Sequence, residues 1–238
     1  PENVRAFVQR HLDAIGEGHL PWQPAWNSIY RAGAMTLQRY RHAMRQRNEV
    51  LRMPNPDDAL LDPWDAQLAE HGTTLIQERR RFIDQLAPLA NAAYKAIADG
   101  EEMSVVYRPD AKEDVPLIES FTAARKSDIR QRMTTRGPHR DDLEIVVDDK
   151  AARQFASQGQ QKTAGLAIKL AELDLMHERT GEYPILLLDD VFAELDASRS
   201  REVLSTIPAA VQCLVTTTEF ALSGELASRA PTLFAVQK

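Results

Sequence analysis

Two adjacent carboxylates, Asp189 and Asp190, follow a short apolar run that starts after Pro184. An apolar run of this length, opened by Pro and closed by acids, is typical of a fully buried strand in a mostly parallel sheet. Such a sheet binds ligands at the carboxyl ends of its strands, where these acids would lie. Asp189 would hold Mg²⁺ directly or through water, because this hard cation takes oxygen ligands and shares them with substrate phosphates. Asp190 would orient or deprotonate an attacking water, as in the arrangement known as Walker B.

A second group stands about thirty residues upstream, where Ser157, Gly159 and Gln160 precede an apolar helical pattern over residues 164–173. A Ser-x-Gly-Gln turn that opens a helix offers a hydroxyl, a close backbone approach and exposed N–H groups to an anion. Both groups also have ordinary interpretations. Acids after an apolar run occur at many strand-to-loop junctions, and Ser157 can be a simple N-cap before a glycine turn.

The turn, the helix, the strand with its two acids and the string that ends at Asp196 together resemble the signature motif, Walker B and D-loop of ABC-type ATPases, which include the SMC-like repair proteins. The strings at 135–143, 157–163 and 186–196 are similar to the RecF family of bacterial recombination mediators. The strings at 40–48 and 62–69 are similar to the helical arm of that family. The resemblance runs approximately from Leu37 to Thr218, and the first thirty-odd residues carry no recognised motif.

In the ABC-type group, nucleotide is held between two subunits, with the signature motif of one facing Walker A and Walker B of the other. The resemblance therefore implies that Ser157 and the backbone near Gly159 and Gln160 contact the γ-phosphate held by the partner chain. It implies that Asp196 lies at the dimer seam and couples the two sites. Since each site then needs both subunits, ATP binding should favour dimerisation.

Two substitutions relative to the ABC-type pattern predict slow hydrolysis. Asp190 replaces the Glu that many of these enzymes use as base, and its shorter side chain reaches the in-line water less easily. Residues 216–218 are a Thr triplet where many relatives carry a switch His. A hydroxyl such as that of Thr218 can hydrogen-bond a γ-phosphate but cannot provide a cation.

The resemblance implies an ATP-dependent DNA-binding recombination mediator in DNA repair, which dimerises on duplex or gapped DNA and assists RecA loading. Its cofactors would be ATP and Mg²⁺. Its partners would be double-stranded or gapped DNA, RecR, a second copy of the chain and, indirectly, RecA and RecO.

One departure from the family is large, because no Gly-x-x-x-x-Gly-Lys-Ser/Thr string occurs in the 238 residues. The backbone N–H groups and Lys of that Walker A loop cradle the phosphates, so the chain should not form a competent nucleotide pocket alone. We therefore expect a truncated or incompletely represented protein. Two other functions stay open: a Mg²⁺-dependent nuclease built on Asp189, Asp190 and Glu194, since clustered carboxylates can hold two Mg²⁺ ions, and a non-catalytic fragment.

The composition, 43% hydrophobic and 27% charged, is that of a soluble globular protein. No apolar stretch approaches the roughly 18 residues that span a bilayer, so we predict a cytoplasmic protein without membrane contact. The lone Cys213 is predicted to be a buried hydrophobe, and neither it nor the His spacing suggests a zinc site.

The net charge of −6 leaves DNA binding to local basic patches. Arg39, Arg41, Arg45, Arg47 and Arg52 cluster in one segment, and further basic groups lie at 79–81 and 125–140. Arg41, Arg45 and Arg52 share one polar helix face, which we predict to contact DNA phosphates; a merely solvated face is the alternative. His139, beside Arg140 and two acids, is either a proton-transfer group or, as we favour, part of a local ion pair.

The alternation of helical and strand patterns predicts an α/β fold, with an ABC-type ATPase lobe around a mainly parallel sheet and a helical arm subdomain. The expected divisions are an unassigned segment at 1–36, the arm at 37–100 and the ATPase lobe at 101–238. Expected helices are 36–53, 59–98 with an interruption near Pro88, 113–133, 160–179 and 197–206; expected strands are 103–107, 143–147, 185–188, 211–216 and 233–236.

Overall fold

The computed structural model describes residues 23–112, 114–189 and 191–216, with side chains from residue 35 onward except at 193 and 194. Two compact units alternate along the chain. Unit 1 contains Leu89–Glu102 and the segment from Ala156 onward, together with residues up to Ser28, and unit 2 contains Ile29–Pro88 and Met103–Phe155. The segment Met103–Phe155, which we expected in the ATPase lobe, thus groups with the helical arm, and the arm boundary near residue 100 stays a prediction. No helix in the described ranges is long and apolar enough to cross a bilayer.

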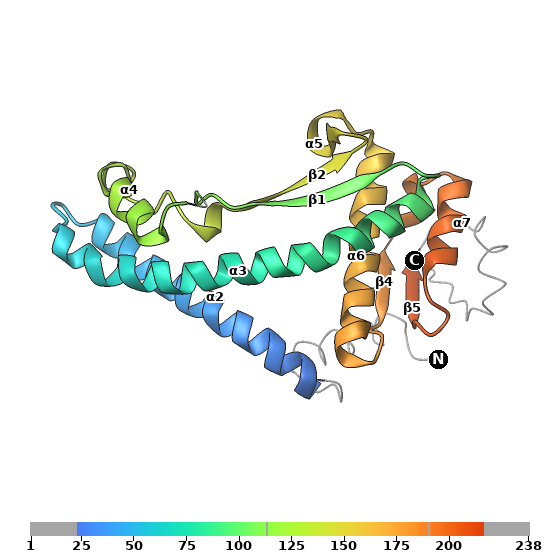
Figure 1. Ribbon diagram of the computed structural model, residues 1–238, viewed down its shortest axis with the longest axis horizontal. Coiled ribbons are helices and arrows are strands. Elements are labelled where there is room, and N and C mark those ends of the chain that lie inside the picture. Colours follow the sequence, from blue (N-terminus) through green and yellow to red (C-terminus); the bar gives the residue numbers. More distant parts are fainter. Residues whose placement is uncertain (1–22, 113, 190, 217–238) are drawn as a thin grey trace, which may run out of the picture. The chain divides into compact units, whose positions relative to one another are not determined.

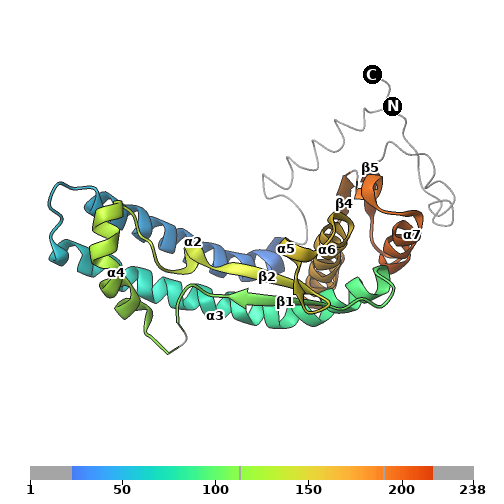
Figure 2. The same cartoon turned by 90° about the horizontal axis from the view of Figure 1, so that it is seen from above.

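Unit 2 is built on a pair of helices, α2 (Gln23–Leu51) and α3 (Asp58–Ile97). A third helix, α4 (Leu117–Gln131), crosses the pair near the connection between them (Figures 1 and 2). The connection at residues 52–57 contains Pro54 and Pro56, which end the first helix as predicted. The apolar stripes of the three helices meet in one core cluster of Tyr40, Ala43, Leu68, Leu75, Leu117 and Phe121. Helix α2 begins at Gln23, earlier than the predicted start at residue 36.

The long helix α3 is continuous through Pro88, and the predicted interruption is wrong. Proline removes one backbone hydrogen bond and crowds the preceding turn, which often breaks a helix. Here the buried stripe continues on both sides of it, with Leu86, Ala90 and Tyr94 almost fully buried. Packing of this stripe therefore offsets the cost of the lost hydrogen bond.

Unit 2 also contains an antiparallel sheet, whose strands we expected in the mainly parallel sheet of the ATPase lobe. Strand β1 (Met103–Arg108) pairs with β2 (Asp142–Val147), with Met103 opposite Val147. The turn predicted at Asp148 and Asp149 joins β2 to the short β3 (Lys150–Ala151), and helix α5 (Ala152–Phe155) follows. Both turn residues have positive φ, at 45° and 62°, which matches the right-handed twist of a two-residue hairpin.

Unit 1 contains the parallel pair that carries the Walker B strand. Strand β4 (Leu186–Asp189) pairs in parallel with β5 (Cys213–Thr216), and this agrees with the predicted parallel sheet. Leu186 and Leu188 are buried but Leu187 is 47% exposed, so the prediction of a fully buried strand is wrong within the described residues. The other elements are α6 (Gln158–Thr180), the 3₁₀ turn η2 (Val191–Glu194) and α7 (Ala197–Thr206). Cys213 is half-buried rather than buried, and the strand expected at 233–236 lies outside the described residues.

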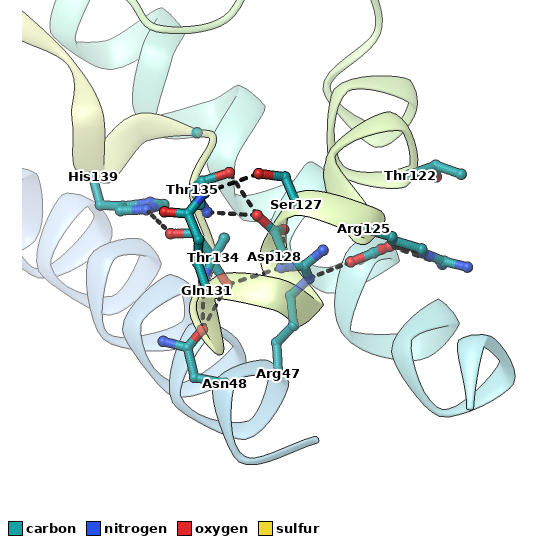
Figure 3. A network of polar contacts seen from close by, with 12 residues as sticks. Arg47, Asn48, Thr122, Arg125, Ser127, Asp128, Gln131, Thr134, Thr135 and His139 are labelled. Carbon is teal, nitrogen blue, oxygen red and sulfur yellow. Dashed lines mark hydrogen bonds and ion pairs between the residues drawn. The ribbon is translucent and has the colours of Figure 1, made fainter. Parts of the chain in front are cut away.

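Arg47 belongs to the basic cluster seen in the sequence of α2, but its side chain is completely buried. Figure 3 shows it in a network of polar contacts. Its Nε donates to Asp65 on α3 at 2.5 Å, and its Nη1 donates to Asp128 on α4 at 2.6 Å. The same Nη1 lies 3.0 Å from the hydroxyl of Thr134. The guanidinium thus joins α2, α3 and α4, because a buried charge is tolerated only when it is paired and hydrogen-bonded.

Arg125 completes the charge balance of this network. It donates to Asp65 at 2.8 Å and to the more exposed Asp62 at 2.6 Å. Asp128 in turn accepts both the backbone N–H and the hydroxyl of Thr135, at 3.0 and 2.6 Å. Two arginines therefore neutralise two fully buried aspartates.

We expect Asp128→Ala to lower the free energy of unfolding by about 3–5 kcal/mol, because it leaves the buried Arg47 guanidinium with one carboxylate fewer. The matched control is Asp62→Ala, which removes a carboxylate that is 67% exposed and should cost at most about 1 kcal/mol. Urea denaturation followed by circular dichroism measures both. If both variants lose the same small free energy of unfolding, Asp65 alone compensates the charge of Arg47.

Candidate functional site

The predicted signature turn is a capping box at the start of α6. The Gln160 N–H donates to the Ser157 hydroxyl at 3.2 Å, and the Gln160 side-chain oxygen accepts the Ser157 N–H at 2.9 Å. The N-cap interpretation of Ser157 is therefore confirmed. It follows from the sequence, since Ser and Gln three residues apart can satisfy each other's backbone donors.

This capping box leaves three hydrogen-bond donors open. The N–H groups of Gln158 and Gly159 have no acceptor among the described residues, and the Ser157 hydroxyl uses a lone pair for the cap, which leaves its hydrogen available. Ser157 and Gln158 are exposed. Because the N-terminus of a helix also carries partial positive charge, the turn can receive an anion such as a phosphate.

Asp189 ends β4 with an exposed carboxylate. The parallel register places Thr216 opposite, and the Thr216 hydroxyl donates to one Asp189 oxygen at 2.5 Å. The other carboxylate oxygen has no partner in the described part of the chain. The contact of Thr216 with Asp189 was not predicted from the sequence, although Thr216 ends a predicted strand and begins the Thr triplet.

The donor chemistry at Asp189 fits Mg²⁺, which commonly uses one or two protein carboxylates and completes its shell with water and phosphate oxygens. Over the described residues, no group of three or more His, Cys, Asp or Glu side chains could form a metal cage. Asp190 and Thr218 lie outside the described residues, as does the side chain of Glu194.

Asp196, the predicted D-loop residue, is the N-cap of α7. Its carboxylate accepts the Arg199 N–H at 2.8 Å while its side chain stays 63% exposed. The start of α7 lies beside the signature turn, because the Arg199 guanidinium is close to Gly159 and pairs with Glu101. Sequence reasoning missed Glu101 and Arg199, which carry no motif and meet only through the fold.

Of the three arginines predicted to contact DNA, Arg41 and Arg45 lie exposed on α2, and Arg52 is exposed in the turn directly after it, where it pairs with Glu49 at 2.6 Å. On the same side of the helix, Asn48 accepts the Thr134 N–H at 2.8 Å, which brings the segment after α4 against α2. That segment and the end of α4 carry exposed Arg130 and Arg132. Two of the basic groups seen in the sequence therefore adjoin in unit 2.

The string at 135–142 is mainly structural. The nearly buried Asp141 accepts from Arg79 at 2.7 Å and also from the Tyr107 hydroxyl. The turn at Gly137 has φ 116°, and a Cβ there would lie 2.7 Å from the Tyr40 hydroxyl oxygen. These contacts hold the turn against α2, α3 and β1. Gly137 lies in a turn, as predicted.

Within the described part of the chain, His139 forms no ion pair, and the predicted pairing is wrong. Its Nε2 lies 3.0 Å from the Thr134 carbonyl, which can only accept, so Nε2 carries the hydrogen. Its Nδ1 then accepts from the Tyr40 hydroxyl at 2.8 Å. Both ring nitrogens thus bond neutral groups, and burial lowers the pKa of His139 below its usual value.

These features define the fold class: a capped turn with open N–H donors at the start of a helix, a carboxylate at the end of a parallel strand and a second capped helix fit the α/β lobe of the ABC-type ATPase fold, which the chain combines with a helical arm. No protein-family model matches the chain. Individual proteins, however, are similar to it in sequence. The DNA replication and repair proteins RecF of Lactobacillus gasseri and Bacillus cytotoxicus are each 41% identical, over 76% of this chain and 52% of theirs.

A solved structure of the recombination mediator protein RecF-ATPrS in the RecFOR pathway superposes with a TM-score of 0.69 at 29% identity, over 80% of this chain and 54% of that one. The corresponding RecF-ATP structure also gives 0.69, at 28% identity, over 83% of this chain and 56% of that one. The resemblance to the RecF family is therefore confirmed. The chain spans about half the length of the curated relatives it matches.

The neutral His139 predicts a pH dependence of stability. Burial lowers its pKa in the folded protein, so below about pH 6.5 the unfolded chain takes up a proton that the folded protein does not. The free energy of unfolding should therefore decrease as the pH falls below this value and level off below the folded-state pKa. In His139→Gln, whose amide can replace one donor and one acceptor, this part of the decrease should disappear.

Urea denaturation between pH 5 and 8 measures the effect. The control His42→Gln changes an exposed position of α2 and should keep the parent's pH profile. An unchanged profile in His139→Gln would contradict the assignment.

Proposed function

We propose that this chain is part of an ATP-dependent, DNA-binding recombination mediator in DNA repair, whose subunits dimerise around nucleotide. The observation that carries the proposal is the turn at the start of α6, where the Ser157 hydroxyl and two backbone N–H groups have no partner within the described residues. It occurs in a chain related to proteins named DNA replication and repair protein RecF and similar in fold to RecF structures with ATP.

In this mechanism the turn of one subunit receives the γ-phosphate of ATP held by the other. The Ser157 hydroxyl and the open N–H groups of Gln158 and Gly159, next to Gln160, stabilise the phosphate charge, as donors at a helix N-terminus do. Asp196 lies at the seam between the subunits and links the two sites.

Within its own subunit, Asp189 would hold the Mg²⁺ that accompanies ATP, and the ion would supply positive charge to neutralise the phosphates. Asp190 orients the attacking water, and Thr218 hydrogen-bonds the γ-phosphate. The shorter reach of Asp190 makes hydrolysis slow, which suits a clamp that reports its nucleotide state. The phosphate-cradling loop that such a site requires is not part of this sequence.

Because ATP makes contacts that exist only in the dimer, it favours dimerisation by linkage. The dimer would bind duplex or gapped DNA in the cytoplasm, act with RecR and, indirectly through RecO, assist the loading of RecA. The structural relatives are RecF proteins of the RecFOR pathway, which supports RecO and RecR as partners.

For DNA, the exposed arginines of α2 are the proposed contact. Buried Arg47 fixes the rotation of α2, so Arg41, Arg45 and Arg52 point away from the core of unit 2. Basic side chains on one helix face can follow a phosphate backbone without reading its sequence.

Ser157→Arg should abolish ATP-induced dimerisation, because a bulky cation fills the space that the partner's phosphate would occupy. Binding of ATP to the monomer should be unchanged, since the turn acts only across the seam. Light scattering with and without ATP, and fluorescent-ATP binding at high dilution, measure the two quantities in a full-length protein that carries the Walker A loop. The control is Ser205→Arg, an exposed position near the end of α7. Normal ATP-dependent dimers of Ser157→Arg would refute the role of the turn.

Changing Arg41, Arg45 and Arg52 together to Gln should weaken duplex binding about equally for all sequences. The slope of log affinity against log salt should fall by up to about one unit per lost phosphate contact. A salt titration of duplex binding by the full-length protein measures both quantities.

The comparison triple is Lys126, Arg130 and Arg132 changed to Gln, which removes the same charge from α4 and its C-terminal cap. If only this second triple lowers affinity and slope, DNA contacts the end of α4 instead of α2.

A further inference from the structure

Glu101 joins the signature turn to the start of α7 within unit 1. One of its carboxylate oxygens accepts from the Gln160 side-chain amide and from the Tyr94 hydroxyl, each at 3.0 Å. Its other oxygen lies 3.6 Å from the guanidinium of Arg199. A carboxylate has about four lone-pair sites, so one side chain can hold these three groups at once.

The contact with Gln160 reaches directly into the capping box. The Gln160 amide accepts the Ser157 N–H through its oxygen and donates to Glu101 through its nitrogen. The Ser157 N–H needs an acceptor and the Glu101 carboxylate needs a donor. These two contacts therefore fix the positions of the oxygen and the nitrogen of the Gln160 amide. Glu101 therefore fixes the side chain that closes the turn.

The contact with Arg199 reaches the D-loop. The Arg199 N–H bonds the Asp196 carboxylate, and the Arg199 Nε lies 3.8 Å from the second oxygen of that carboxylate. The other end of the guanidinium lies over Gly159, where a Cβ would be only 3.1 Å from Nη1. Glycine at this position thus allows the start of α7 to lie against the turn.

We propose that Glu101 and Arg199 are positioning residues for the nucleotide-facing edge, which hold the signature turn and the D-loop at a fixed distance from each other. The proposal rests on the proposed function of this edge, in which the turn receives a phosphate across the subunit seam. With the two parts held together, the phosphate contact at the turn and the seam contact at Asp196 form in one step. Neither residue touches the nucleotide.

The proposal predicts that loss of Glu101 changes ATP-induced dimerisation but not ATP binding by the monomer. ATP binding by the monomer depends on the Walker A and Walker B side of the same subunit, so loss of Glu101 should leave it unchanged. Closure of the dimer requires the turn and the D-loop to match the partner together. Loss of Glu101 should therefore weaken ATP-induced dimerisation, by about tenfold if one charge-assisted contact is lost. A merely structural role would lower thermal stability without separating the two quantities.

The test compares Glu101→Ala, Arg199→Ala and the double variant in the full-length protein with its Walker A loop. Dimerisation is measured by light scattering with ATP and Mg²⁺, and monomer binding by fluorescent ATP at high dilution. We expect dimerisation to weaken about tenfold in each single variant while ATP binding stays unchanged. The double variant should weaken no more than either single one, because the two residues act as a unit. The matched control is Glu102→Ala, whose carboxylate is 69% exposed and pairs with Lys95; it should behave like the parent.

A second variant keeps the proposal testable if Glu101→Ala does not fold. Gly159→Ala removes no polar group and improves helix propensity, but its Cβ would lie 3.1 Å from the Arg199 Nη1, so the guanidinium must shift by a few tenths of an ångström. We expect a smaller loss of dimerisation with unchanged ATP binding. Normal dimerisation of the Glu101 and Gly159 variants overturns the proposal, as does parallel loss of dimerisation and ATP binding. A parent protein that stays monomeric with ATP overturns the proposed function itself.

Discussion

The buried guanidinium of Arg47 is the interaction on which unit 2 depends. It lies between Asp65 of α3 and Asp128 of α4, and both carboxylates are as fully buried as the arginine. Removing such charges from water is costly, and the cost is offset only when the geometry satisfies both partners. One guanidinium nitrogen, Nη2, still has no partner within the described part of the chain. Because the planar guanidinium offers its donors in fixed directions, the three helices can be joined in few arrangements.

This constraint also determines what unit 2 presents to solvent. Successive residues of a helix are rotated by about 100°, so burying Arg47 turns the opposite side of α2 outward. Arg41 and Arg45 lie on that outward side. The contact of Asn48 with Thr134 then brings the end of α4 next to the same face. Stability and the basic surface are thus two consequences of one helix orientation.

In unit 1, the same residues serve the helix and the proposed phosphate contact. Ser157 stabilises α6 by accepting a backbone N–H, yet its hydroxyl hydrogen stays available, and the first two helical N–H groups stay open. A stable helix start and an anion site are therefore compatible, because capping satisfies only some of the donors at a helix N-terminus. Asp196 shows the same double use at α7, where a capping carboxylate remains largely exposed.

Local patterns in the sequence determined much of this protein: the helical pair, the positions of the described strands, the capping turn at Ser157 and the turn at Gly137. Each depends on residues a few positions apart, whose periodicity or backbone preference is visible in the chain. The tertiary structure alone decided that Arg47 is buried, that His139 is neutral and that Glu101 meets Gln160 and Arg199. Arg47 and Asp128 are 81 residues apart, and Glu101 and Gln160 are 59 apart. A charged side chain looks the same in the sequence whether it faces water or a distant partner, so only the packing of remote segments could assign these roles.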